Sequence, residues 1–275
     1  MRQLKVDRLF HQAKLLPQSF LWLVILLVIT GLITVFAACS PSSSNKLTRQ
    51  PKTAIIDQLY STQPNGGFIT EVSQALENYG FAVDVYRGAE VTVDLYRRLP
   101  KYGYKLIIFR AHSGLIRAEG QKRLKTAIFT NEPYSRKKYL TEQLNYMLPM
   151  VRVKEGEPFF FGIDSKFVTE SMDGRFDDTL VIITGCSCLY FNDMAQAFIC
   201  KGASVYLAWD RTVDADYVDE ASTYLIRELC QDGLIVKKAV NRTMAEKGRD
   251  PTYRASLRYF PLQSGDKTLK QLISG

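Results

Sequence analysis

The chain has 275 residues, of which 46% are hydrophobic and 23% charged, a balance typical of a globular protein with a substantial core. The formal net charge is +8, but residues 1–50 carry six basic side chains against one acidic (6 − 1 = +5), so the other residues hold only 8 − 5 = +3. A nucleic-acid-binding domain concentrates its basic residues on one face, and this distribution therefore argues against a nucleic-acid partner.

A long apolar run near the N-terminus predicts a membrane anchor. Residues 20–38 contain no charged side chain, and a helix of about 20 apolar residues spans the hydrocarbon core of a bilayer. Lys and Arg gather in the leader, residues 1–19, and such residues are retained on the cytoplasmic side. We therefore expect the rest of the chain to lie on the extracytoplasmic face of a membrane.

The end of the apolar run leaves two modes of attachment open. Val35-Phe36-Ala37-Ala38-Cys39 resembles a lipobox, in which Cys39 would be the lipidated residue, whereas an uncleaved signal anchor would keep the run in the bilayer. Both modes leave the following domain tethered. Residues 39–51 are rich in Ser, Pro and polar side chains, which predicts a flexible tether, and the folded domain is expected at residues 52–275.

Within that domain, short apolar runs alternate with amphipathic segments. In chain order, the pattern predicts a strand at 53–59, a helix at 68–79, strand 82–86, helix 91–99, strand 105–111, helix 141–148, strand 179–184, helix 193–200, strand 204–209, helices 216–230 and 234–247, and strand 256–260. Three strands contain LIIF, LVII and VYLAW, which are apolar without alternation and therefore buried on both faces. The sequence thus predicts an α/β fold, a three-layer α/β/α sandwich with a mostly parallel sheet.

A histidine and a cysteine follow two of these buried strands. His112 comes directly after strand 105–111 and is the only histidine of the domain, while Cys186 follows strand 179–184. In parallel sheets, ligands and chemistry sit at the carboxyl ends of the strands. A thiol with a pKa near 8.5 is a weak nucleophile at neutral pH, and a nearby imidazole can take its proton and return it to a leaving amine. Backbone N–H groups at Gly114 and Cys186 are candidates for binding the developing oxyanion.

The cysteines also allow other interpretations. Cys188 is a rival nucleophile two residues further along, and Cys186 with Cys188 forms a Cys-x-Cys pair that would suit a metal ion. The sequence near this pair lacks a second pair of soft ligands, so we expect neither a metal nor another cofactor. A small buried cysteine and a lone surface histidine are common, so neither residue alone would indicate catalysis.

Together, these motifs resemble the caspase-like cysteine peptidases, a superfamily that includes caspases, legumains, gingipains, clostripain and separases. The resemblance is carried by LIIFRAHSG, by ITGCSC and by GASVYLAWD, and it covers roughly residues 52–262. It implies a caspase-type fold with His112 as general acid/base and Cys186 as nucleophile. The family's His-Gly is His112-Ser113-Gly114 here, so Ser113 and Gly114 are the implied oxyanion donors.

The same resemblance implies where a substrate would be selected. In the family, the strand after the cysteine helix borders the pocket for the residue that precedes the scissile bond, which corresponds to Trp209 and Asp210 in this chain. Asp210 would favour Lys or Arg, as in clostripain-like members. A capping or ion-paired aspartate is the alternative interpretation of Asp210.

Three functional hypotheses follow from the sequence. The first is a membrane-tethered cysteine endopeptidase that acts on a peptide or protein substrate, with cleavage after basic residues. The second is a catalytically inactive caspase-like domain that serves as a surface binding or scaffold module. The third is a flavodoxin-like receiver or nucleotide domain, which requires a Gly-rich phosphate loop, and Asn65-Gly66-Gly67 is the only hint of one.

Overall fold

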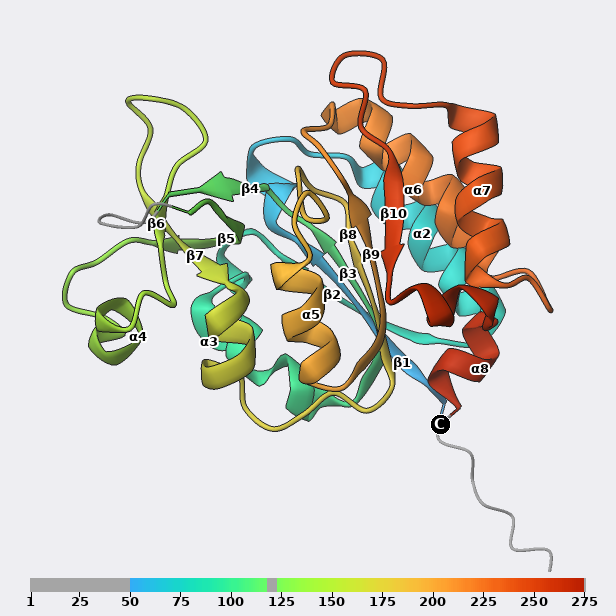
Figure 1. Ribbon diagram of the computed structural model, residues 1–275, viewed down its shortest axis with the longest axis horizontal. Coiled ribbons are helices and arrows are strands. Elements are labelled where there is room, and N and C mark those ends of the chain that lie inside the picture. Colours follow the sequence, from blue (N-terminus) through green and yellow to red (C-terminus); the bar gives the residue numbers. More distant parts are fainter. Residues whose placement is uncertain (1–49, 118–122, 275) are drawn as a thin grey trace, which may run out of the picture. The chain divides into compact units, whose positions relative to one another are not determined.

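A computed structural model describes residues 50–117 and 123–274 of the chain (Figure 1). The predicted anchor at 20–38 and the predicted lipidation site Cys39 lie outside these residues. Within the described ranges, no helix combines the length and apolar character needed to cross a bilayer.

The main structural element is a six-stranded sheet with the strand order β10-β9-β8-β3-β1-β2. All neighbouring strands in it run parallel except β10, which pairs antiparallel with β9. The expected α/β fold with a mostly parallel sheet is therefore confirmed. The strands are β1 (Lys52–Asp57), β2 (Ala82–Arg87), β3 (Tyr104–Arg110), β8 (Thr179–Ile183), β9 (Ala203–Trp209) and β10 (Leu257–Phe260).

Side chains of the central strands are buried on both faces of this sheet. In β3, Ile107 and Phe109 belong to one hydrophobic cluster, while Leu106 and Ile108 belong to the other. Successive side chains of a strand point to opposite faces, so a continuous apolar run places apolar side chains on both faces of the sheet, and helices cover each face. One face packs on α3 (Val93–Arg98) and α5 (Asp193–Cys200). The other packs on α2 (Gly66–Tyr79), α6 (Ala215–Leu229), α7 (Val236–Lys247) and α8 (Leu269–Ile273).

Local signals set the ends of the helices. Helix α2 begins after Asn65, whose side chain accepts a hydrogen bond from the Phe68 N–H, and it ends at Gly80 with φ of 108°. The helix predicted at 141–148 is shorter than expected, because α4 (Leu140–Leu144) stops before Tyr146, which has φ of 57°. Short 3₁₀ segments lie at Gln58–Ser61, Gly88–Glu90, Leu99–Tyr102 and Leu262–Asp266, and a π-helical turn at Phe167–Ser171.

A second, smaller sheet was not anticipated from the sequence. It is antiparallel, with the order β4-β5-β7-β6, and consists of β4 (Ser113–Ile116), β5 (Lys125–Pro133), β6 (Met150–Val151) and β7 (Phe160–Asp164). Strand β4 begins at the residue after His112, and Figure 1 shows this sheet beside the carboxyl ends of the central strands. The small sheet therefore continues directly from the candidate site.

Candidate active site

The parallel pairing of β3 and β8 brings the two candidate catalytic residues to the same edge of the sheet. Phe109 of β3 pairs with Ile183 of β8, and three residues further along each segment stand His112 and Cys186. These two strands form the central pair of the six-stranded sheet. Register alone therefore delivers an imidazole and a thiol to neighbouring positions beyond the strand ends.

The segments that follow the two strands are in direct contact. The Ser113 Oγ donates a hydrogen bond to the carbonyl oxygen of Cys186 at 2.8 Å. A Cβ atom placed on Gly185 would lie 2.3 Å from the carbonyl oxygen of Ala111 and 2.3 Å from the Ser113 Oγ. Only glycine fits at such a distance, so Gly185 is required for this approach. Sequence reasoning did not assign Gly185 a role, although its position between strand and cysteine could have suggested one.

A cavity of about 650 Å³ lies at this edge and contains both candidate residues in its lining. The two strand-end segments form one part of the lining, and the β9–α6 connection forms another. The lining residues include Leu59, His112–Leu115, Phe129, Arg152, Gly185–Ser187, Thr212–Ala215 and Tyr253. The volume falls in the range of ligand-binding clefts.

The Cys186 thiol is half-buried and contacts the backbone of Val213. The Val213 N–H lies 3.5 Å from Sγ, and Sγ lies 3.7 Å from the Val213 carbonyl oxygen. Burial raises the pKa of Cys186 above its usual value of 9.0; the Val213 amide opposes this increase and the Asp250 charge adds to it. The thiol is therefore protonated at neutral pH when the cavity is empty.

The His112 main chain is held from two sides. Its N–H donates to Gln58 Oε1 at 2.8 Å, and its carbonyl accepts from the Phe129 N–H at 2.9 Å. Burial lowers the pKa of the imidazole below 6.5, a change that Glu157 opposes and Arg110 reinforces. The ring is thus neutral at pH 7, the form in which it can accept a proton. Among the described residues, its nitrogens make no hydrogen bond with the Cys186 thiol or with any other group.

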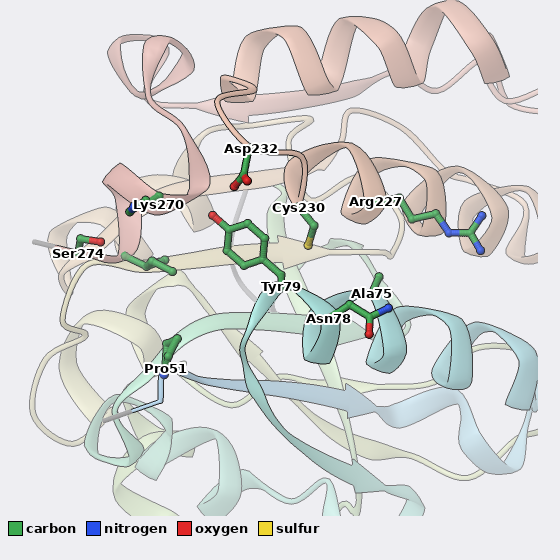
Figure 2. Close-up of a pocket in the computed structure, with 10 residues that line it drawn as sticks. Pro51, Ala75, Asn78, Tyr79, Arg227, Cys230, Asp232, Lys270 and Ser274 are labelled. Carbon is green, nitrogen blue, oxygen red and sulfur yellow. The ribbon is translucent and has the colours of Figure 1, made fainter. Parts of the chain in front are cut away.

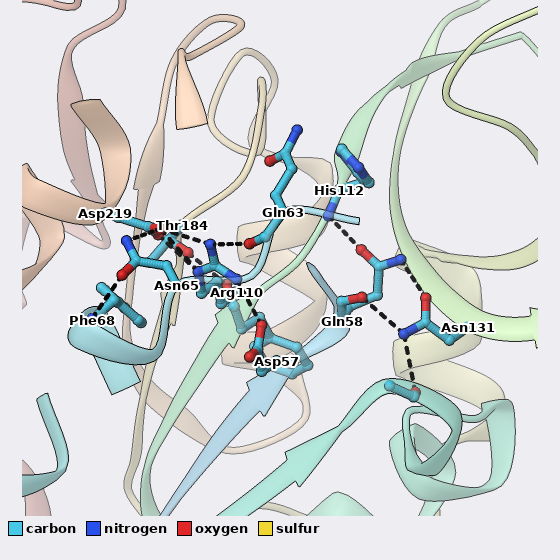
Figure 3. A network of polar contacts seen from close by, with 12 residues as sticks. Asp57, Gln58, Gln63, Asn65, Phe68, Arg110, His112, Asn131, Thr184 and Asp219 are labelled. Atoms are coloured by element: carbon cyan, nitrogen blue, oxygen red, sulfur yellow. Dashed lines mark hydrogen bonds and ion pairs between the residues drawn. The ribbon is translucent and has the colours of Figure 1, made fainter. Parts of the chain in front are cut away.

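Gln58 is itself fixed by Asn131 (Figure 3). The Gln58 Nε2 donates to Asn131 Oδ1 at 2.6 Å, and Asn131 Nδ2 donates to the carbonyl oxygens of Gln58 and Gly88 at 2.8 and 3.0 Å. This pair of amides ties the end of β1 to β5 and holds the backbone at His112. Neither amide was singled out from the sequence.

A buried ionic cluster lies directly before His112 in the chain (Figure 3). Arg110, whose side chain is 1% exposed, bridges Asp57 at 2.8 Å and Asp219 at 2.7 Å, and it also donates to the carbonyl oxygen of Gln63. Asn65 adds a hydrogen bond to Asp219 at 3.0 Å. The cluster therefore joins the ends of β1 and β3 to helix α6 and to the N-terminus of α2.

The oxyanion donors implied at Ser113 and Gly114 differ in where their N–H groups point. Gly114 pairs with Ala127 across the β4–β5 ladder, and two residues before Gly114 the His112 carbonyl accepts a hydrogen bond from the Phe129 N–H. Because hydrogen-bonded and non-hydrogen-bonded pairs alternate, the Gly114 amide points towards β5 and the Ser113 amide points away from it. Of the two, only Ser113 therefore has a backbone N–H directed away from the small sheet, and the oxyanion role stays a prediction.

The structure does not bring the predicted substrate-binding residues into the Cys186 cavity. The Trp209 side chain is 0% exposed and packs in the core, with its ring 5.5 Å from that of Tyr217, so it offers no surface to a substrate. Asp210 accepts a hydrogen bond from the Ser256 N–H at 2.7 Å and pairs with Arg258 at 3.2 Å. It lines a separate cavity of about 460 Å³.

Two further cysteines, Cys188 and Cys230, do not compete with Cys186. Cys188 is 0% exposed, and burial raises its pKa to about 12, which makes it unreactive at neutral pH. Cys230 lies beside Tyr79 in a cavity of about 640 Å³ next to Pro51, at the start of β1 and thus at the opposite end of the parallel strands (Figure 2). Its lining contains no histidine, and burial raises the pKa of Cys230 to about 12. The described residues contain no cluster of three or more ligands suited to a metal ion.

Comparison with models of known protein families gives no match. A comparison with curated proteins gives none either. The chemistry of the site therefore has to be argued from its own geometry.

Proposed function

We propose that the protein is a membrane-tethered cysteine endopeptidase with a three-layer caspase-like fold, in which Cys186 is the nucleophile and His112 the general acid/base. One observation carries this proposal. A thiol and a neutral imidazole, delivered by two adjacent parallel strands, line one cavity of about 650 Å³, and a glycine at 185 allows the two segments to touch. The tether rests on the sequence of residues 20–38, and the extracytoplasmic location rests on the basic leader.

The proposed reaction starts from a neutral pair. On substrate binding, the His112 ring turns towards Cys186 and takes the thiol proton while Sγ attacks the carbonyl carbon of the scissile bond. The carbonyl oxygen gains the negative charge and is bound by backbone N–H groups, with Ser113 the best-directed candidate. The imidazolium then gives its proton to the departing amine, and water hydrolyses the resulting thioester to regenerate the thiol.

Cleavage after basic residues requires a substrate that reaches beyond the Cys186 cavity to Asp210. A Lys or Arg side chain of the substrate would have to replace Arg258 as the partner of Asp210, which stands outside the Cys186 cavity. A substrate long enough to enter both cavities would be needed for Asp210 to select it.

The decisive experiment uses a thiol-reactive peptide electrophile and a peptide-library cleavage assay. We expect Cys186→Ala to abolish both labelling and cleavage, and His112→Gln to reduce both strongly. Cys200→Ala is the matched control, because Cys200 is exposed on α5 and does not line the cavity. Cleavage at the wild-type rate in Cys186→Ala would exclude this mechanism.

A second candidate is the inactive binding or scaffold module. It is favoured by the resting state of the pair: within the described residues, the thiol hydrogen-bonds only with the Val213 backbone, and the imidazole has no hydrogen-bond partner. In that case the cavity would bind a peptide without cleaving it. Selective labelling of Cys186 that disappears in His112→Gln would contradict the binding module, while peptide binding without labelling or cleavage would support it.

A further inference from the structure

The sulfur of Cys186 is held by a short connection between β9 and α6. Residues 210–214 form this connection, and within it Val213 presents both its N–H and its carbonyl to Sγ, at 3.5 and 3.7 Å. A backbone N–H directed at sulfur favours the thiolate, because it stabilises negative charge on that atom. The position of the Val213 backbone therefore influences the reactivity of Cys186.

Both ends of this connection are anchored to the segment between α7 and β10. At one end, the Asp210 N–H donates to the Ser256 carbonyl at 3.1 Å, and the Ser256 N–H donates back to Asp210 Oδ1 at 2.7 Å. At the other end, the Asp214 N–H donates to Asp250 Oδ2 at 2.8 Å. The Asp214 N–H and the Val213 carbonyl belong to one peptide unit. The Asp250 carboxylate therefore fixes the unit whose carbonyl contacts the sulfur, which adjoins the unit that carries the Val213 N–H.

Backbone N–H groups, and no cation of the described part of the chain, bind the Asp250 carboxylate. It is 0% exposed, and among the described residues it forms no ion pair. Its Oδ1 accepts from the N–H groups of Thr252 and Tyr253, which leaves Oδ2 for Asp214. A buried carboxylate is costly unless hydrogen-bonded, and here three backbone donors satisfy it.

We propose that Asp250 is a positioning residue for the nucleophile: by accepting the Asp214 amide, it holds the Val213 N–H against the sulfur of Cys186. The inference rests on the proposed function only in treating Cys186 as the reacting thiol. Asp250 does not line the cavity and makes no hydrogen bond with the sulfur among the described residues, so it acts through the 210–214 connection.

The expected direction of the effect depends on two opposing influences. The Val213 amide lowers the pKa of Cys186, and the Asp250 charge raises it by a smaller amount. Asp250→Asn removes the charge and leaves a single oxygen. That oxygen keeps more hydrogen bonds in the place of Oδ1, where it still accepts from Thr252 and Tyr253, so the amide NH₂ faces the Asp214 N–H. The Asp214 amide is then released, the weakened contact at sulfur outweighs the missing charge, and Cys186 becomes a poorer thiolate.

The test is alkylation of the full chain in detergent micelles by iodoacetamide, read at Cys186 by peptide mass spectrometry across a pH series. The lost charge partly compensates for the weakened contact, and we expect alkylation of Asp250→Asn at pH 7 to be about threefold to tenfold slower, equivalent to about 0.7–1.4 kcal/mol. Asp164→Asn is the matched control: Asp164 is 1% exposed, accepts the Phe167 N–H and does not line the cavity. An unchanged or faster rate in Asp250→Asn would overturn the proposal.

A measurement on the wild-type chain covers the case in which Asp250→Asn fails to fold. The ¹⁵N-labelled protein is titrated with pH, and the Val213 amide resonance is followed beside the alkylation rate. We expect the Val213 shift to follow the Cys186 pKa; an amide that does not respond would refute the contact. Neither readout requires peptide cleavage, so a failure of the peptidase proposal is distinguishable from a failure of this one.

Discussion

Replacement of Gly185 by alanine tests the contact on which the site depends. The new Cβ would lie 2.3 Å from the Ala111 carbonyl oxygen and the Ser113 Oγ, whereas an ordinary contact begins at 3.4 Å, so the two segments must separate by 3.4 − 2.3 = 1.1 Å. The separation breaks the 2.8 Å hydrogen bond from Ser113 to the Cys186 carbonyl. Overpacking of this kind costs about 1–3 kcal/mol. A misplacement of about 1 Å in a catalytic pair reduces the rate by about 100-fold.

Two assays measure these effects. Thermal unfolding should show a lower Tm, by roughly 2–4 °C for each kcal/mol in a domain of this size. Electrophile labelling of Cys186 should fall far more than the loss of stability explains at 25 °C. Gly66→Ala is the control, because a Cβ at Gly66 meets no atom within 4 Å. Wild-type stability and labelling in Gly185→Ala would show that the strand ends do not meet as described.

Three further outcomes are expected. Iodoacetamide should modify Cys186 in the folded chain, at a rate that still rises above pH 9.0, and should leave Cys188 untouched until the chain unfolds; modification of Cys188 in the folded chain would contradict its burial. Because the folded pKa of His112 is lowered, the unfolded chain binds a proton between pH 6.5 and that lower value while the folded chain does not. The contribution of His112 to the free energy of unfolding is therefore present above pH 6.5 and lost on acidification. In urea unfolding, acidification should lower the free energy of unfolding less in His112→Gln than in the wild type; equal decreases in the two proteins would refute this. Arg110→Met leaves two buried carboxylates without their cation and should cost about 3–5 kcal/mol in the free energy of unfolding, and a loss below 1 kcal/mol would refute the buried cluster.

The central sheet could be predicted because burial leaves a clear mark on its strands. A run such as LIIF has no polar residue to place in water, so helices must cover both faces, and the structure has them there. The edge strands of the small sheet, β4 and β6, carry no such pattern. Strands β4 and β6 have only 4 and 2 residues, too few to establish a period of two, and they derive their stability from cross-strand partners.

The candidate site was predictable in position but not in its supports. Strand ends point to His112 and Cys186, whereas the Val213 contact and the Asp250 carboxylate depend on connections whose path no local pattern encodes. The prediction that Trp209 contacts a substrate did not take into account that successive side chains of a strand point to opposite faces of the sheet. Leu207 and Trp209 share the face that packs on α6, which places the indole in the core.

Because β3 and β8 lie at the centre of the sheet, the part of the cavity that they carry tolerates less change than the part formed by the β9–α6 connection. We expect amides in these two strands to exchange with solvent mainly by opening of the whole domain, so the strand ends that carry His112 and Cys186 persist as long as the fold does. The β9–α6 connection, residues 210–214, combines both kinds of residue. Substitution of the exposed Thr212, which lines the cavity, can change what the cavity admits at small cost to folding, whereas Val213 is buried in the hydrophobic core and contacts the sulfur.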